Sequence, residues 1–234
     1  YIFNTEVEPL DDVRVRQALS YAIDRTELVE QVTRGGQFPA YGLTPPLANY
    51  PEVVGFEEDF EEARDLLADA GYPNGDGFPT LTILYNTSEG HKRIAEYVQQ
   101  KWNEVLGIQV EILNQEWGTY LDSRDAGDFD ISRAGWQDDY IDPNSFLDMF
   151  ITGSSQNDGK WSNAEYDELI ETALTQSGET RLDTLREAEE MLMEELPIMP
   201  FYYYATSNWI DTDVWGGWYT NILDIHPFKD IYRK

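Results

Sequence analysis

The sequence contains no cysteine. This absence excludes disulfide bonds, thiolate nucleophiles and metal sites with cysteine ligands. Histidine is also scarce, with only 2 residues, so a metal site would depend mainly on carboxylates. The turn-forming residues 73–77 (PNGDG) lack the twelve-residue ligand spacing of a calcium loop. We therefore expect neither a metal ion nor another cofactor.

Basic residues are few as well. The chain has 16 Lys and Arg residues against 45 Asp and Glu residues, which gives a formal net charge of −29. A surface this acidic repels nucleic-acid backbones and anionic lipid, so we expect no nucleic-acid partner. One hypothesis for the acidity is adaptation to high salt, in which screening weakens the self-repulsion of the chain.

Long apolar runs are missing too. No stretch approaches the roughly 18 apolar residues that a membrane-spanning helix needs. Hydrophobic residues still make up 41% of the 234 residues, which is enough for a packed core. The chain begins at Tyr1 without a basic and apolar leader, so we expect either a removed targeting segment or a fragment.

The common catalytic motifs are not present. We find no G-x-S-x-G, no H-E-x-x-H, no Walker loop, and no G-x-G-x-x-G after a predicted strand. Asp138 and Asp139 are adjacent, so on an extended segment they point to opposite faces and do not form a glycosidase pair. We therefore expect a protein that is not an enzyme.

Hydrophobic periodicity predicts an α/β fold. Helices are expected at residues 12–35 (with caps at Asp11 or Asp12 and at Asp24), 59–70, 88–106, 116–126, 142–150, 163–176 and 179–195, and strands at 81–85, 108–113, 129–132 and 198–205. The alternation of strands and helices between residues 81 and 132 implies parallel pairing through right-handed crossovers. We expect a parallel or mixed sheet flanked by helices within residues 1–205. The tail, residues 206–234, reads as short strands and turns with little pattern of its own.

Polar and aromatic side chains follow the three predicted parallel strands. His91 follows the first strand, and Trp117 follows the second. The third strand is followed by Arg133, Gly135, Trp136, Gln137, Asp138 and Asp139. Because ligands of parallel sheets bind beyond the carboxyl ends of the strands, we expect one shared site for a small organic ligand.

Each of these residues also has a purely structural interpretation. Arg133 continues the alternation of Phe129 and Ile131, so a partly buried guanidinium needs an anion. That anion is either an acid of this chain or a carboxylate of the ligand. His91 is either a capping or packed residue or part of the site. Likewise, the Asp138–Asp139 pair is a solvated turn or a ligand contact, and the two tryptophans are core residues or pocket walls.

Several segments in fixed order resemble the family 5 extracellular solute-binding proteins of ABC importers, above all the peptide-binding members. These segments are residues 12–19 (DVRVRQAL), 22–25 (AIDR), 39–42 (PAYG) with 44–46 (TPP), 85–88 (YNTS) with 91–92 (HK), 114–117 (NQEW), 129–130 (FD) with 133–136 (RAGW) and 139–140 (DY), 143 with 145–147 (SFL), and 202–204 (YYY). The resemblance covers essentially the whole chain.

The resemblance implies a periplasmic-binding-protein-like fold of the two-lobed type II, cluster C class. Family members are roughly twice as long as this chain, which resembles only the C-terminal half (lobe III). Its tail would return to the missing lobe I. The implied function is to bind oligopeptides in the cleft between the lobes and to deliver them to the permease subunits. The implied protein is a monomer outside the cytoplasm, in the periplasm or at the cell surface, with or without a lipid anchor.

The resemblance also implies roles for individual residues. Asp139 would accept the α-ammonium group of the peptide, and the backbone at Gly135 and Gln137 would pair with the peptide like an added strand. The positions that meet ligand carboxylates are Arg133 and His91, and those that line hydrated side-chain pockets are Trp117 and Trp136. Gln137 and Asp138 replace smaller residues of the family pattern. Gln31 and Thr33 fall where a relative carries lysines, which leaves the preferred peptide length open.

Three other functions remain open at this point. The first is a carrier on the same fold whose ligand would be a dipeptide, a murein peptide, nickel or an oligosaccharide. A hydrolase would use Asp139 or Glu116 with His91. A scaffold for a protein partner would bind no small ligand.

Overall fold

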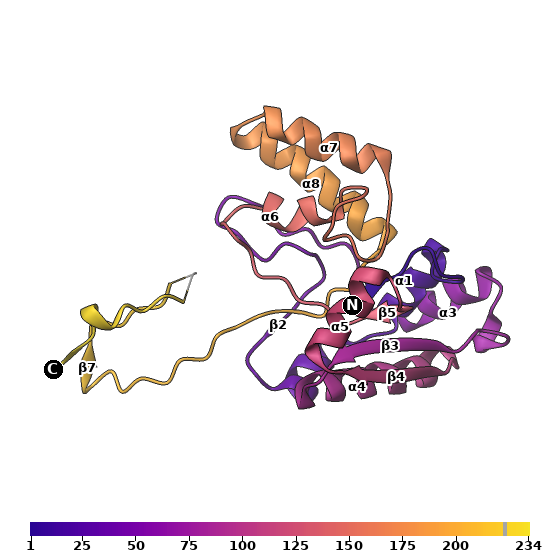
Figure 1. Cartoon of the computed structure of the whole chain (residues 1–234), viewed down its shortest axis with the longest axis horizontal. Coiled ribbons are helices and arrows are strands. Elements are labelled where there is room, and N and C mark those ends of the chain that lie inside the picture. Colours follow the sequence, from indigo (N-terminus) through magenta and orange to yellow (C-terminus); the bar gives the residue numbers. More distant parts are fainter. Residues whose placement is uncertain (222–223) are drawn as a thin grey trace.

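The computed structural model describes residues 1–221 and 224–234 (Figure 1). The helices are α1 (Val13–Tyr21), α2 (Arg25–Glu27), α3 (Phe60–Asp69), α4 (Glu89–Leu106), α5 (Trp117–Ala126), α6 (Asn144–Leu147), α7 (Ala164–Thr175) and α8 (Gly178–Glu195). The strands are β1 (Ile2–Phe3), β2 (Phe38–Pro39), β3 (Leu81–Asn86), β4 (Val110–Gln115), β5 (Ile131–Ser132), β6 (Tyr202–Tyr203), β7 (Trp215–Gly216) and β8 (Tyr232–Arg233). In Figure 1, α6, α7 and α8 lie together above the sheet and the helices that flank it.

The main sheet is mixed, as the sequence predicts. Its strand order is β1-β5-β3-β4, in which β3 pairs in parallel with both β4 and β5. Only β1 runs antiparallel to its neighbour, β5. The crossovers through α4 and α5 therefore place the carboxyl ends of β5, β3 and β4 at one edge of the sheet.

Two apolar cores lie on opposite sides of this sheet. Residues of β3 alternate between them, because Ile83 packs with α1 and α4 whereas Leu84 packs with α5, α7 and α8. On α4, the predicted stripe of Ile94, Val98 and Trp102 is buried in the first core. The sheet is thus covered on both faces, which keeps its strands fixed relative to the edge where polar residues gather.

Side-chain caps mark the start of several helices. The carboxylate of Asp12 accepts a hydrogen bond from the Arg14 backbone N–H, and that of Asp24 accepts one from Glu27. Asp59 accepts from the first turn of α3. The contacts of Asp12 and Asp24 confirm the two predicted caps, and Asp24 begins a second helix within residues 12–35, as predicted.

Other boundaries differ from the prediction. The segment after α2 continues as a π-helical stretch, Leu28–Thr33, and ends at Arg34 in the left-handed conformation rather than at a glycine. The predicted strand 129–132 contracts to Ile131–Ser132. Phe129 packs in the second core and Ile131 in the first, so the alternation expected through Arg133 is wrong before residue 131. The predicted strand 198–205 is regular only at Tyr202–Tyr203, because only two of its residues pair with β2.

The tail runs away from the rest of the molecule (Figure 1). It contains β7 and β8, which pair with each other and with no other strand described. Large apolar side chains of the tail face solvent, with Trp209 98% and Phe228 91% exposed. Within the described part of the chain, no helix has the length and apolar character needed to cross a bilayer.

Candidate functional site

The three predicted groups of polar residues meet at one sheet edge. Asn86 at the end of β3 pairs with Gln115 at the end of β4, and the Arg133 backbone N–H donates to Leu84 O at 2.8 Å. His91 lies in the first turn of α4, directly after β3. Trp117 is the first residue of α5, directly after β4. The carboxyl ends of β5, β3 and β4 therefore bring His91, Trp117 and Arg133 to the same edge.

Trp117 belongs to this edge rather than to the core. Its ring is 53% exposed and stacks on Tyr120, with the ring centroids 5.6 Å apart. The Tyr120 hydroxyl in turn donates to the backbone carbonyl of Arg133. An exposed indole held by a buried tyrosine forms a fixed apolar surface beside Arg133.

Arg133 is half-buried and has no carboxylate partner in the described residues. Its Nη2 donates to the Tyr204 hydroxyl at 2.7 Å, and no Asp or Glu oxygen of the described chain lies within 4.0 Å of it. The internal ion pair that the sequence left open is therefore not formed here. A guanidinium with free donors can accept an external anion.

The pKa of His91 is affected by its burial and by the charge of Arg133. Its Nδ1 lies 3.2 Å from the Asn86 carbonyl oxygen, and the ring is half-buried. Burial first, and the positive charge of Arg133 second, lower the pKa of His91 below its usual value of 6.5. The imidazole is therefore neutral at pH 7, and Arg133 supplies the positive charge of this edge.

A cleft of about 810 Å³ opens beside Arg133. Of the predicted site residues, Arg133, Gly135, Trp136 and Gln137 line it, together with Asp138. His91, Trp117 and Asp139 are not among its lining residues. The cleft therefore gathers one part of the predicted site, and the rest lies outside its lining.

Two hydrogen bonds to Ser145 hold the segment that follows β5 in place. The Trp136 indole N–H donates to Ser145 O at 2.8 Å, and the Asp139 backbone N–H donates to Ser145 Oγ at 3.1 Å. A Cβ on Gly135 would lie 2.5 Å from the Tyr204 hydroxyl oxygen, so a larger residue does not fit without a shift. Gly135 and Gln137 are both exposed residues of this segment.

Asp139 is exposed and forms no salt bridge with any described residue. Its negative charge reaches Asp148, whose pKa is raised by burial first and by Asp139 second. The nearby Asp142 forms a bidentate pair with Arg181, with both contacts at 2.8 Å. Asp139 thus keeps a carboxylate free for a cation near the α6 end of the segment.

Sequence reasoning missed several walls of the cleft. The unanticipated lining residues come from segments 40–47 and 198–206 and include Leu43, Pro45, Pro46, Tyr202, Tyr203 and Tyr204, with Arg124 from α5. Arg124 pairs with Asp158, so its charge is already neutralised. The proline pair and the three consecutive tyrosines were the available signals, but nothing local shows that they face a cleft.

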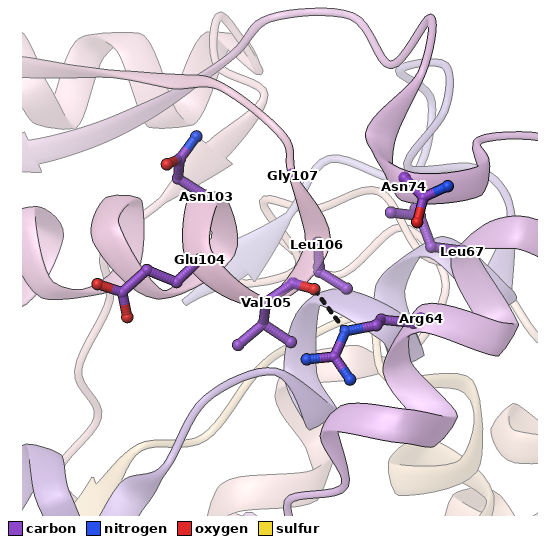
Figure 2. Close-up of a pocket in the computed structure, with 8 residues that line it drawn as sticks. All are labelled: Arg64, Leu67, Asn74, Asn103, Glu104, Val105, Leu106 and Gly107. Carbon is purple, nitrogen blue, oxygen red and sulfur yellow. Dashed lines mark hydrogen bonds between the residues drawn. The ribbon is translucent and has the colours of Figure 1, made fainter.

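A second, smaller cavity of about 260 Å³ lies elsewhere (Figure 2). It is lined by α3 and by the end of α4, and Arg64 Nε donates into it to Val105 O at 2.9 Å. Gly107 borders it just before β4, so the cavity lies at the amino ends of the strands. This position is opposite the edge where ligands of parallel sheets bind. Throughout the described residues, no three His, Asp or Glu side chains are grouped to hold a metal ion.

Comparisons with known proteins identify relatives of this chain. Residues 1–158 match the bacterial extracellular solute-binding proteins, family 5. The periplasmic oligopeptide-binding protein OppA of Escherichia coli is 38% identical over 242 residues, which cover 100% of this chain and 44% of that protein. The periplasmic murein peptide-binding protein MppA of the same organism is 39% identical, with 99% and 44% covered.

A solved structure shares the fold. The periplasmic oligopeptide-binding protein OppAIV of Borrelia burgdorferi superposes with a TM-score of 0.88 at 38% identity, covering 100% of this chain and 47% of that one. Other relatives have different names: a probable deoxycholate-binding periplasmic protein, YgiS, of E. coli at 36% identity and heme-binding protein A of Haemophilus influenzae at 32%. The chain spans less than half the length of the curated relatives OppA and MppA. It belongs to the family 5 bacterial extracellular solute-binding proteins.

Proposed function

We propose that this chain forms one lobe of an oligopeptide-binding protein that serves an ABC importer. The observation that carries the proposal is Arg133, a partly exposed residue that borders a cleft of about 810 Å³ and has no carboxylate partner in the described residues. The relatives named for oligopeptides and murein peptides supply the ligand class. A peptide carries the carboxylate that such a guanidinium binds.

In this proposal, the peptide is recognised through its charged ends and its main chain. Arg133 meets a ligand carboxylate, with His91 as a second group at that end. Asp139 accepts the α-ammonium group. An ammonium about 4 Å from a carboxylate gains roughly 4 kcal/mol at an effective dielectric of 20, and about 1 kcal/mol in bulk water. Because Asp139 is exposed, its contribution lies toward the lower figure until the cleft closes.

The main chain and the pocket walls supply the remaining affinity. The exposed backbone at Gly135 and Gln137 pairs with an extended peptide as an added strand does. Trp117 and Trp136 line side-chain pockets in which water can match different side chains at a small cost. Recognition of this kind leaves most side chains of the peptide unread, which suits an importer of many peptides.

We further propose that residues 1–205 form the lobe and that the tail, residues 206–234, returns to a second lobe. The exposed Trp209 and Phe228 and the isolated β7–β8 pair support this division, since such apolar surface is usually covered. Closure of the two lobes around the peptide would then signal the permease subunits. The protein would act as a monomer in the periplasm or at the cell surface.

A carrier for another solute is the second candidate. The similarity of this chain to a probable deoxycholate-binding protein and to a heme-binding protein supports this candidate. A ligand without an amino group would leave Asp139 without a cationic partner. A peptidase is less well supported, because the hydrogen bond of His91 in the described residues is to the Asn86 carbonyl oxygen and not to Asp139 or Glu116.

Isothermal titration calorimetry tests the proposal. The full-length protein is titrated with alanine peptides of about two to five residues in three forms: free, N-acetylated and C-amidated. We expect each cap to weaken binding by about tenfold or more, as hydrogen bonds to charged groups contribute about 1.5–3 kcal/mol. Equal affinity for the free and the capped peptides would refute recognition through the termini. The 234-residue chain alone should bind all forms weakly, because half of the enclosing wall is absent.

A further inference from the structure

Glu189 is a buried carboxylate that the proposed binding function does not use. It lies on α8, its side chain is 0% exposed, and it does not line the cleft. No lysine, arginine or histidine of the described residues forms an ion pair with it. Burying a carboxylate without a cation costs free energy, so hydrogen bonds to other groups must offset that cost.

Those partners all belong to one loop. Glu189 Oε1 accepts hydrogen bonds from the backbone N–H groups of Leu43 at 3.0 Å and Thr44 at 2.8 Å. Its Oε2 accepts from the Tyr50 hydroxyl at 2.7 Å. All three donors therefore come from residues 43–50, which lie about 140 positions before Glu189 in the sequence.

The same loop forms a wall of the cleft. Its residues Leu43, Pro45, Pro46 and Leu47 line the cleft, on segments separate from the lining residues 133–138. The two prolines lack N–H groups, so the loop cannot join a strand ladder over this stretch. The N–H groups of Leu43 and Thr44 must then find an acceptor elsewhere, since buried backbone donors are costly when unpaired.

We infer that Glu189 is a positioning residue that fixes the loop 43–50 as a wall of the binding cleft. The buried carboxylate replaces the missing strand partner: one oxygen takes the two adjacent N–H groups and the other takes the tyrosine. Tyr203 supports the same wall, because its hydroxyl donates to Gly42 O at 3.1 Å. The link from the wall to ligand affinity rests on the proposed function, whereas the positioning itself does not.

Hydrogen exchange of the Leu43 and Thr44 amides tests the inference. The variants, made in the full chain, are Glu189→Ala and Glu189→Gln, and the matched control is Leu185→Ala, a fully buried residue of the same helix that forms no hydrogen bond to the loop. We expect exchange at both amides to be at least about tenfold faster in Glu189→Ala. Glu189→Gln should restore protection, because its amide oxygen accepts the same two N–H groups.

Unchanged exchange in Glu189→Ala, or an equal increase in Leu185→Ala, would overturn the inference. A second readout is the affinity of the full-length protein for trialanine, which should fall about tenfold in Glu189→Ala and stay within about twofold in Glu189→Gln. Faster exchange without any loss of affinity would contradict the link between the position of this loop and ligand affinity. Failure of the wild-type protein to bind any alanine peptide would instead count against the proposed function, and the exchange result would still decide the positioning role.

Discussion

In the proposed function, Asp139 is the residue that recognises the amino group of the peptide. It is exposed and has no ion-pair partner in the described residues, while the neighbouring Asp142 is paired with Arg181. Asp139→Asn in the full-length protein should lower the affinity for free-amine peptides by roughly 10- to 100-fold and leave the affinity for N-acetylated peptides unchanged. Only a peptide with an ammonium group gains from the negative charge of Asp139. Calorimetry on both peptide forms measures this difference.

Asp138→Asn is the matched control for that experiment. It removes the same charge from the adjacent residue, which lines the cleft. An equal loss in both variants would mean that the general negative potential matters rather than Asp139. An equal loss for free and acetylated peptides would also contradict the assigned role.

In the proposed function, His91 should make the affinity for the ligand depend on pH. Its pKa is lowered by burial first and by Arg133 second, so the ring is uncharged at pH 7. A bound ligand carboxylate favours the imidazolium, so affinity for peptides with a free carboxylate should rise as the pH falls from 7 through the lowered pKa. His91→Gln should flatten this rise, and calorimetry at several pH values between 7 and 5 would show it.

The same lowered pKa has the opposite effect on stability. In the free protein, the unfolded chain takes up the proton at a higher pH than the folded chain does. The contribution of His91 to stability is therefore fully present above the unfolded pKa of about 6.5 and declines as the pH falls below that value.

The binding experiment has its own contradicting outcome. If wild-type protein and His91→Gln showed the same pH profile for binding, the histidine would have no part in the site.

At the scale of elements, the sequence predicted what adjacent residues determine. The helix α4 follows from the spacing of Ile94, Val98 and Trp102 and from Gly107, which adopts φ +75° at its end. Its boundaries differ from the prediction by one residue at most. The parallel pairing of β3, β4 and β5 followed from the same regularity, and with it the shared edge of His91, Trp117 and Arg133.

The irregular walls of the cleft were not predictable in this way. The loop 43–50 is fixed by Glu189, about 140 positions later in the chain, and residues 136–139 are fixed by Ser145. The apolar alternation suggested that Phe129 and Ile131 share a face, but the strand begins only at Ile131. Contacts beyond the neighbouring residues, some of them distant in sequence, decide these segments rather than local propensity.

The N-cap of α3 tests the local account. Asp59 accepts hydrogen bonds at 3.0 Å from the backbone N–H groups of both Glu61 and Glu62. Asp59→Ala should lower the free energy of unfolding by about 1 kcal/mol. Urea titration of this variant is compared with Asp65→Ala, an exposed aspartate within the same helix that caps nothing. A cost no larger than that of Asp65→Ala would show that the cap is not stabilising.

At the scale of the whole molecule, the charge of −29 is the dominant feature. Carboxylates that repel one another destabilise the compact state, and salt screens this repulsion over about 10 Å at 0.1 M. The melting temperature should therefore rise by several degrees between low and multimolar NaCl. KCl should give the same shift, since screening does not depend on the identity of the cation. A melting temperature that did not change with salt would remove the hypothesis of salt adaptation.

The molecule as a whole also sets the limits of ligand binding. The chain spans 44% of the length of E. coli OppA, and the tail carries exposed aromatic side chains beyond residue 205. In the proposed function, the cleft beside this lobe needs a second surface to exclude water, so both the affinity for the peptide and the signal to the permease would depend on closure. The family is one of solute-binding proteins, which carry their ligands rather than convert them.

Native mass spectrometry of the full-length protein tests the central claim most directly. The protein is incubated with an equimolar mixture of alanine peptides, haem and deoxycholate, and the bound masses are read. We predict complexes with intact peptides, released uncut, in preference to the other two ligands. Retention of haem or deoxycholate without peptide, or the appearance of cleaved peptides, would contradict the account.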